Sequence, residues 1–508
     1  MIVERLALLH GRGRIVSIGP SSYGPEVAVD RRLRLVAASP GSMTGRHRAR
    51  FPYDDAWTWD RDHFSRPSLP SVVLADSVLV CSATLEGMRD PAPILGMIRA
   101  WLDEAAAAVI TLELPPERAH ASEIERAAHL ERFRAMLAAE RLDPTFLGWT
   151  ASTSAGRAKT TAMAIVDRVV GPGPSHAPAD FRVTAIMTAY NEADVIGPAI
   201  EALISDGVLV HVIDNWSTDE TPAIAETYLG RGVVAVERYP EAPTQTYDWT
   251  RLLARVEEVA QSTPTDWVIH HDADERRTPP WMQTSLRDGL WTADRSGFTA
   301  VDHTVMNFRP IDNGYVAGAS FEDHFRWFEL GSTPDLLLQV KAWKRTAGLP
   351  VDLRTSGGHD AAFEGRRVFP YKFLLKHYPI RSQGHGERKV RVDRVARWNP
   401  EERAMGWHDH YDSVGQGHSF LSDPATLSRF DPETAYATWL GEIVAGASLV
   451  PDPAPAWARG SLLTRRLHEV AMRVVIDSGL SALISRGTAR TPRSVRTRLV
   501  RAKRTWLG

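Results

Sequence analysis

Residues 267–275 have the sequence WVIHHDADE, and the middle of the chain is organised around this stretch. Residues 267–269 form a short apolar run, which is typical of a buried strand that reaches the surface at the following histidines. Asp272 and Asp274 come next, and residues two apart at a strand end point the same way. Two such carboxylates suit one hard cation, Mg²⁺ or Mn²⁺. A solvated acidic turn would have the same sequence, so the neighbouring segments must decide between the two interpretations.

Two earlier segments repeat the pattern of an apolar strand that ends in a polar turn. Residues 181–192 (FRVTAIMTAYNE) and 208–220 (VLVHVIDNWSTDE) each predict a strand and a turn, with a helix after each. A third strand is predicted at 233–239 and a helix at 249–262. Ligands of open α/β sheets bind outside the carboxyl ends of the strands. We therefore expect the three polar turns to meet in one cleft, which favours a binding site.

The first 170 residues also alternate strands with helices, which predicts a second, parallel α/β layer. The expected strands lie at 14–19, at 33–38, within 71–81 and at 107–114, and the expected helices at 90–105 and 121–142. The run 148–169 is expected to form a polar loop followed by an apolar helix. Residues 171–180 begin GPGPSHAP, and glycine with proline defeats helix and strand alike. We place a linker there, between a domain of residues 1–170 and one of residues 181–420.

Composition excludes some classes of protein. The 508 residues carry a formal net charge of −2, so the overall charge gives no reason to expect a nucleic-acid partner. The one cysteine, Cys81, lies in an apolar run and indicates a core residue in a reducing compartment. The N-terminus lacks the pattern of a secretion signal, and no run approaches the ~18 apolar residues of a membrane span. We expect a cytoplasmic protein.

Residues 421–508 are predicted to form a C-terminal helical region with a basic tail. From residue 486 to the end there are eight Lys or Arg residues and no acidic residue. Such a tail can lie on an anionic surface, which would make the protein peripheral at the inner face of the cell membrane. A solvated terminal helix fits the same sequence, so both interpretations stay open.

The motifs YNE, DNxSxD and DADE, in this order and spacing, make residues 182–415 resemble a family 2 glycosyltransferase with the GT-A fold, of the soluble bacterial kind. The resemblance implies Mn²⁺- or Mg²⁺-dependent transfer of a sugar from a nucleotide diphosphate sugar, a UDP-sugar first of all, to an acceptor hydroxyl. The acceptor, whether glycan, lipid-linked or small molecule, stays open. By resemblance, the nucleotide would lie against Tyr190, Asn191, Glu192, Asp214 and Asn215, its ribose against Asp272, and the metal at Asp272 and Asp274.

One departure from the family pattern leaves the identity of the donor nucleobase open, and a further residue is a candidate metal ligand. Many members with a uridine donor have a second aspartate where this chain has Asn215. An amide can hydrogen-bond bases that a carboxylate would not, so the base stays open. In GT-A enzymes a downstream histidine often supplies another metal ligand. His377 resembles that residue, with His359 as the alternative.

The transfer chemistry needs positive charge where the diphosphate leaves. Arg381, Arg388 and Lys389 are predicted to bind the phosphates, because Arg forks match phosphate oxygens and Lys adds a point charge. If the reaction inverts the sugar, a carboxylate must accept the proton of the acceptor hydroxyl. Asp323 is the expected base, and Asp360 is the alternative.

Two expectations follow from these assignments. The chain lacks the QxxRW motif of processive synthases, because Arg394 stands where glutamine would be required, so we expect transfer of single residues. Asp274→Asn is expected to abolish metal-dependent transfer while leaving thermal unfolding nearly unchanged.

Residues 10–160 resemble a class I methyltransferase-like Rossmann fold, which would make the chain a pair of Rossmann-like α/β domains, the second a GT-A fold. Such enzymes admit the methionine cofactor at a glycine-rich turn, but residues 19–24 here are GPSSYG, and Pro20 and Tyr23 hinder close backbone approach to a ligand. We expect a domain that kept the fold and lost the cofactor. The competing hypotheses are an enzyme that also methylates and a non-catalytic nucleotide-sugar-binding module.

Overall fold

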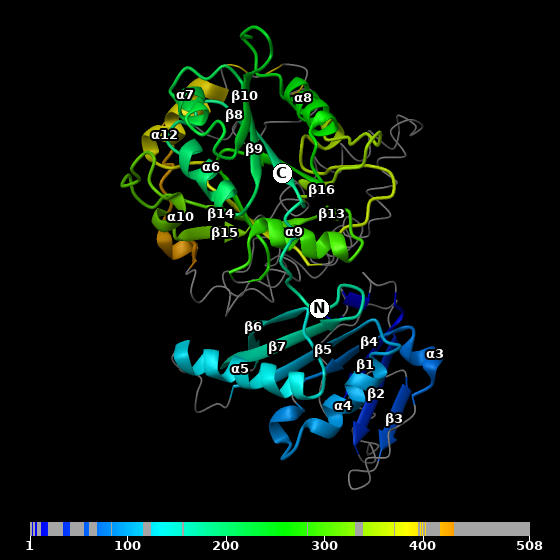
Figure 1. The fold of residues 1–508 in the computed structure, drawn as a ribbon. Coiled ribbons are helices and arrows are strands. Elements are labelled where there is room, and N and C mark those ends of the chain that lie inside the picture. Colours follow the sequence, from blue (N-terminus) through cyan, green and yellow to red (C-terminus); the bar gives the residue numbers. More distant parts are fainter. Residues whose placement is uncertain are drawn as a thin grey trace, which may run out of the picture.

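The computed structural model describes residues 3, 6–7, 12–18, 34–40, 55–59, 69–82, 84–114, 123–154, 157–281, 283–330, 339–369, 371–394, 397, 399, 402 and 417–430. Within these residues the chain forms two α/β bodies, with the N-terminal one drawn below the other (Figure 1). The described strands make three sheets, of which the first belongs to the N-terminal body.

The first sheet is mostly parallel and has the order β3-β2-β1-β4-β5-β7-β6. β7 runs antiparallel to both of its neighbours, β5 and β6. Buried aliphatic side chains of α4, such as Ile94 and Ile98, join the core beneath β1 and β4. The elements are β1 (Arg14–Ile18), β2 (Arg34–Pro40), β3 (Asp55–Trp59), α3 (Ser71–Leu74), β4 (Ser77–Cys81), η1 (Leu85–Gly87), α4 (Ala92–Trp101), β5 (Ala107–Glu113), α5 (Glu123–Ala139), β6 (Phe146–Ser154) and β7 (Arg157–Asp167).

Two local expectations for this body are wrong. Residues 148–154 lie in β6 and residues 157–167 form β7, where a loop and a helix were expected. β7 pairs with β5 from Ala107↔Asp167 to Glu113↔Thr161. The strand conformation of β7 therefore depends on a partner some 50 residues earlier, which local sequence propensity does not reveal. Residues 71–74 form one helical turn, and the strand expected within 71–81 is confined to β4.

The second sheet has the order β10-β9-β8-β11-β16-β13, and its first four strands are parallel. Asp272 at the end of β11 pairs with Thr188 of β8, and Ala189 pairs with Asp214 at the end of β9, so these carboxyl ends lie side by side. The helix expected at 249–262 is confirmed, and Asp248 caps it by accepting a hydrogen bond from the Arg251 N–H. The elements are β8 (Val183–Ala189), α6 (Ile196–Ser205), β9 (Leu209–Asp214), α7 (Thr221–Glu226), β10 (Val233–Arg238), α8 (Trp249–Ser262), β11 (Trp267–Asp272), β13 (Ala300–Val301) and β16 (Ala342–Lys344).

The third sheet, with the order β12-β17-β14-β15-β18, continues from the DADE turn. The chain leaves β11 at Asp272, turns through Asp274 and enters β12, whose Glu275 pairs with His377 of β17. The turn therefore lies where the two sheets meet, and His377 is brought opposite it. The remaining elements are β12 (Glu275–Thr278), α9 (Leu286–Arg295), β14 (His303–Phe308), α10 (Phe321–His324), β15 (Trp327–Leu330), η3 (Arg354–Ser356), β17 (Phe373–His377), α12 (Gln383–Arg388), η4 (Lys389–Arg394), η7 (Pro424–Thr426) and β18 (Ser428–Arg429).

The predicted C-terminal region is described only at its beginning. Residues 421–430 contain the turn η7 and the strand β18, which pairs with β15. Residues 431–508, with the expected helices, the basic tail and its membrane contact, lie outside the described residues. None of the helices in the described ranges has the length and apolar character needed to cross a bilayer.

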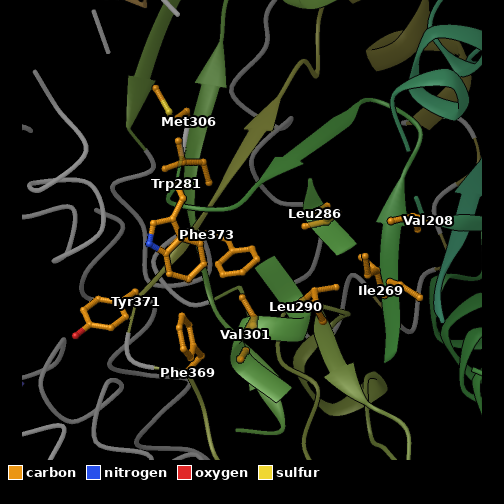
Figure 2. Close-up of a cluster of buried hydrophobic side chains, with 14 of the residues drawn as sticks. Val208, Ile269, Trp281, Leu286, Leu290, Val301, Met306, Phe369, Tyr371 and Phe373 are labelled. Carbon is orange, nitrogen blue, oxygen red and sulfur yellow. The ribbon is translucent and has the colours of Figure 1, made fainter. Parts of the chain in front are cut away.

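A shared hydrophobic core joins the two bodies. Trp281, Phe369 and Phe373 gather beside α9 and β17 (Figure 2), and their cluster extends to Phe146 and Met163 of the N-terminal sheet. Hydrogen bonds accompany this packing. The indole N–H of Trp281 donates to the Thr145 carbonyl (2.7 Å), and the buried Tyr371 hydroxyl donates to Asp167 Oδ2 (2.6 Å).

The linker expected at 171–180 is also bound to the second body. Residues 168–182 contain neither helix nor strand. The Ala177 N–H donates to Asp288 Oδ1 (2.8 Å), and the Ser175 N–H donates to Thr292 Oγ1 (3.2 Å) of α9. The segment therefore connects two bodies whose relative orientation is held by packing.

Candidate active site

A cavity lies at the carboxyl ends of β8, β9 and β11, where the three polar turns meet as expected. Its walls also come from the start of α8, the end of β17 and the first residue of η4. Seven of the lining residues were predicted from the sequence, namely Tyr190, Glu192, Asn215, Asp272, Asp274, His377 and Lys389. The others are Thr188, Ala189, Tyr247, Trp249, Leu252, Ala273 and Pro379.

Asn191 holds the YNE turn in place. Its φ of +56° is a left-handed conformation that asparagine tolerates. Its N–H donates to Ser217 Oγ (2.9 Å), its Oδ1 accepts from the Thr218 N–H (2.8 Å), and its Nδ2 donates to Asp393 Oδ1 (3.0 Å). These contacts tie the turn after β8 to the turn after β9 and to η4. Asn191 itself is buried and does not line the cavity.

Asp272 lies on the cavity wall, beside the ammonium group of Lys341. Its Oδ1 accepts from Thr188 Oγ1 (3.0 Å) and its Oδ2 from the Lys341 ammonium (2.9 Å), which also reaches Glu275 Oε1 (3.1 Å). Burial would raise the pKa of Asp272, but Lys341 holds that pKa well below its ordinary value. Its side chain is 28% exposed, so it faces a ligand as an ionised acceptor.

Asp274 and His377 face each other at one end of the cavity. His377 Nε2 lies 3.7 Å from Asp274 Oδ1, and His377 Nδ1 lies 3.0 Å from the amide oxygen Asn307 Oδ1. Burial lowers the pKa of His377, which favours the neutral ring. A neutral ring that donates from Nδ1 to Asn307 carries its lone pair on Nε2, and this lone pair points toward the carboxylate.

Lys389 and Arg381 hold the second oxygen of Asp274. The Lys389 ammonium bridges Asp274 Oδ2 (2.8 Å) and Glu192 Oε1 (2.9 Å). The Arg381 guanidinium is 1% exposed, bonds Glu192 and Asp194, and lies 3.8 Å from Asp274 Oδ2. Burial would raise the pKa of Asp274, but Lys389 and Arg381 keep it below its ordinary value. Lys389 therefore lines the cavity, whereas Arg381 is engaged beneath it by carboxylates.

Aromatic rings and an amide form the opposite end of the cavity. Asn215 Nδ2 donates to the Tyr239 carbonyl (3.0 Å), so one of its two amide N–H groups is already in use. Asp214 is fully buried, its Oδ2 accepts from the Ser217 N–H (3.1 Å), and burial raises its pKa. Tyr190 and Tyr247 add aromatic surface, on which nucleobases stack. This end suits the base of a nucleotide.

Besides Asn191, Asp214 and Arg381, four further predicted residues do not line the cavity. His359 Nδ1 lies 2.9 Å from Gln339 Nε2, and Asp360 pairs with Arg366. The Arg388 side chain is half exposed, with its Nε 3.5 Å from Asp393 Oδ2. Asp323 is 80% exposed on α10.

Asp323 nevertheless lies near the end of the cavity that Asp274 and His377 form. Phe321 of α10 packs on Tyr378, the residue after His377, with ring centroids 4.7 Å apart. The neighbouring Glu322 is committed to Arg276 and Lys376. Asp323 has only Arg326 at 3.6 Å as an ion-pair partner among the described residues, so it is the carboxylate of α10 that could serve an acceptor.

Sequence reasoning missed Lys341, Tyr247 and Trp249. Lys341 lies in the apolar run LLLQVKAW, and a lysine in such a run must be buried against carboxylates. That signal could have found it. Tyr247 and Trp249 flank the helix cap of α8 and stack at 5.9 Å, but nothing local in the sequence separates them from core aromatics.

One group of three possible metal ligands occurs within the described ranges, and it is not the predicted one. Donor atoms of Glu192, Asp194 and His385 lie within 4.8 Å of one another. The Arg381 guanidinium already bonds both carboxylates, and its backbone N–H donates to His385 Nδ1 (3.3 Å). A dication there would face this guanidinium, so the group suits Arg381 better than a metal.

Comparison with known proteins gave a family match to part of this region and matches to solved structures. Residues 184–287 match the model of the family Glycosyl transferase family 2. Glucosyl-3-phosphoglycerate synthase from Mycobacterium tuberculosis, solved with Mn²⁺, UDP and glucosyl-3-phosphoglycerate, is 21% identical over 27% of this chain and 50% of its own, with a TM-score of 0.17. Residues 1–349 of TarS from S. aureus, solved with UDP, are 17% identical over 39% of this chain and 61% of that one, with a TM-score of 0.23. The match thus spans less than two thirds of either structure. A search of curated protein sequences gave no match.

Proposed function

We propose that this protein is a metal-dependent glycosyltransferase that moves a sugar from a nucleotide diphosphate sugar to an acceptor hydroxyl. The observation that carries the proposal is the pair of Asp274 and His377, whose Oδ1 and Nε2 atoms lie 3.7 Å apart in a cavity lined by three polar strand ends. The family 2 match over residues 184–287 supports the same class of enzyme.

The residues at this end fit Mn²⁺ or Mg²⁺. Ligand atoms about 2.1 Å from one ion can lie 3.7 Å apart, so Asp274 Oδ1 and His377 Nε2 could bind the same ion. Mg²⁺ is often held by one or two protein ligands together with substrate phosphates and water. Asn307 fixes the histidine tautomer that such binding requires. When bound, the ion would neutralise charge that develops on the leaving diphosphate.

The remaining residues of the cavity would bind and orient the donor. Lys389 supplies positive charge beside the diphosphate, and Glu192 together with Arg381 positions it. Asp272, ionised and partly exposed, would accept hydrogen bonds from ribose hydroxyls. The base would lie at the end formed by Tyr190, Asn215 and Tyr247. We expect a UDP-sugar first, and the acceptor stays open.

An inverting, non-processive reaction is part of the proposal. Asp323 would take the proton of the acceptor hydroxyl, and its support is the packing of α10 on the residue after His377. The Asp360 carboxylate is committed to Arg366, which makes it the weaker alternative. Asp323→Asn should cut turnover far more than donor binding, and equal losses in both would remove the base assignment.

The test of the proposed function is a thermal-shift screen with nucleoside diphosphates and nucleotide-sugars, with and without Mn²⁺. A true donor stabilises the fold by mass action, by about 2.7 kcal/mol at 100 times its Kd. We expect stabilisation that needs both nucleotide and metal, together with slow donor hydrolysis. Stabilisation by a nucleotide that is the same with and without Mn²⁺ would refute the proposed metal dependence. The absence of any nucleotide effect would remove the function itself.

For the N-terminal body we propose a methyltransferase-like Rossmann domain without the methionine cofactor. The support is the strand order 3-2-1-4-5, which is that of a doubly wound sheet, with the pair β7 and β6 added at the β5 edge. The turn at residues 19–24, on which cofactor loss was argued, lies outside the described residues. Calorimetry with S-adenosylmethionine distinguishes the hypotheses, because measurable binding would support an enzyme that also methylates.

A further inference from the structure

We propose that Arg397 is a specificity-determining residue that reads the nucleobase of the donor. It would select bases that carry a keto oxygen, as uracil and guanine do, at the position where cytosine and adenine carry an amino group. The proposal rests on the proposed function, because it requires a nucleoside diphosphate in the cavity. Arg397 lies outside the segment that matches the family model, residues 184–287.

Arg397 contacts three residues of the cavity wall at its base end. Its guanidinium carbon lies 4.1 Å from the centroid of the Tyr190 ring, and its NH2 group lies 3.5 Å from Asn215 Oδ1. Its backbone carbonyl accepts a hydrogen bond from the Tyr247 N–H. Tyr190, Asn215 and Tyr247 come from three separate segments and all line the cavity. The guanidinium is therefore held at the end where a base would stack on tyrosine.

The guanidinium has an unused donor. Its NH1 group is buried and has no hydrogen-bond partner among the described residues. Buried donors without a partner are rare in folded proteins because their desolvation is not compensated. An acceptor brought by a ligand at this end would compensate it. Because a guanidinium stays charged and has no acceptor atoms, that ligand group must be an oxygen or nitrogen lone pair.

A buried acceptor belongs to the residue that precedes Asn215. Asp214 Oδ1, the neighbour of Asn215 in sequence, is also without a partner within the described ranges. One N–H of Asn215 Nδ2 donates to the Tyr239 carbonyl and its Oδ1 lies 3.5 Å from Arg397, so this amide is already partly engaged. The guanidinium donor contacts the amide, and the carboxylate acceptor belongs to the residue before it.

This donor and acceptor complement one kind of base edge. Uracil and guanine present a ring N–H next to a carbonyl oxygen, which match a carboxylate and a guanidinium in turn. Cytosine and adenine present a ring-nitrogen acceptor next to an amino donor, so both polarities are reversed. The site therefore fits UDP and GDP better than CDP and ADP.

The chain on both sides of Arg397 is anchored to the cavity rim. Before it, Asp393 Oδ1 accepts from Asn191 Nδ2 (3.0 Å). After it, Glu402 Oε1 accepts from the N–H (2.7 Å) and the hydroxyl (3.0 Å) of Thr250 at the start of α8. These anchors hold Arg397 in position before a ligand arrives, which lowers the entropic cost of binding.

The test is calorimetric titration of the full chain with UDP, GDP, CDP and ADP in the presence of Mn²⁺. We expect the wild-type protein to bind UDP or GDP more tightly than CDP and ADP. Arg397→Ala should weaken the preferred diphosphate by about 10- to 100-fold, the range for a hydrogen bond to a charged group, and leave CDP and ADP within about twofold. Arg397→Lys keeps the charge but not the planar fork, so it should also lose preference, by more than about threefold.

Arg231→Ala is the matched control. Arg231 stacks on Tyr228 with 5.5 Å between its guanidinium carbon and the ring centroid, away from the cavity, and its loss should leave all four affinities unchanged. Equal weakening of all four diphosphates by Arg397→Ala, or tighter binding, would overturn the proposal, as would a wild-type protein without base preference. If the wild-type protein binds none of them, the proposed function fails as well. If it binds and both Arg397 variants keep its preference, this inference alone fails.

Discussion

Asp274→Asn separates the proposed metal-binding role of this carboxylate from its role in the buried charge network. The substitution keeps the volume and one carbonyl oxygen but removes the charge that faces Lys389 at 2.8 Å, His377 at 3.7 Å and Arg381 at 3.8 Å. Lys389 retains Glu192 at 2.9 Å, and Arg381 retains two carboxylates. Neither cation is therefore left without a partner.

The expected cost lies below that of isolating a buried charge. Removing the sole partner of a buried ion costs about 3–5 kcal/mol, so we expect roughly 1–3 kcal/mol for Asp274→Asn. This revises the expectation from sequence that unfolding would be nearly unchanged, because the contacts with Lys389 and Arg381 were not visible in the sequence. Urea unfolding without ligand measures this loss of stability.

The metal part is measured as the extra stability that UDP and Mn²⁺ give together. At 100 times Kd this amounts to about 2.7 kcal/mol in the wild-type protein, and Asp274→Asn should lose most of it. Asp194→Asn is the control, since Asp194 pairs with the same Arg381 at 2.7 Å but does not line the cavity. It should cost similar stability and keep the metal effect. A metal effect retained by Asp274→Asn and lost by Asp194→Asn would refute the reasoning, and would move the ion to the group of Glu192, Asp194 and His385.

Three further predictions concern buried polar groups. Lys341→Met removes the cation that faces Asp272. It should lower the free energy of unfolding in urea by about 3–5 kcal/mol and weaken UDP binding. A loss below about 1 kcal/mol would contradict the charge network. Tyr371→Phe removes the hydrogen bond to Asp167 between the two bodies. It should lower the free energy of unfolding by about 1.5–3 kcal/mol without changing the Kd for UDP. A changed Kd would contradict the separation of this contact from the site. Burial lowers the pKa of His303 from 6.5 to about 3, so below pH 6.5 the unfolded chain binds a proton that the folded chain does not. This group therefore lowers the free energy of unfolding by about 2 kcal/mol when the pH is reduced to 5. His303→Gln should remove this part of the pH dependence in thermal melts, and an unchanged pH dependence would refute the prediction.

Strand ends and turns could be predicted from sequence because their signals are local. The apolar runs that end in polar turns located β8, β9 and β11, and the run at 249–262 located α8 within its observed bounds. The convergence of the turns followed from the general rule for open sheets. Five cavity residues lie in these turns, whereas His377 was predicted from the family resemblance and Lys389 from the charge that the leaving diphosphate needs.

What failed depended on partners far away in the chain. β7 could not be recognised without β5, because its threonines, alanines and valines also suit a loop and a helix. Arg381 was predicted to bind phosphate, and its position beneath the cavity depends on Glu192 and Asp194, almost 190 residues earlier. Arg397 gave no sequence signal, because its environment is made by Tyr190, Asn215 and Tyr247 from three separate segments.

The core that Trp281 and Phe369 build with the N-terminal sheet decides how this chain can be divided. A cut within residues 171–180 follows the most obvious boundary in the sequence, yet it would uncover an aromatic face on one piece and an aliphatic face on the other. Apolar patches of this kind promote self-association when exposed. Either piece transplanted into another protein would need a matching surface to cover it, so the two halves are modules in sequence but a single unit for engineering.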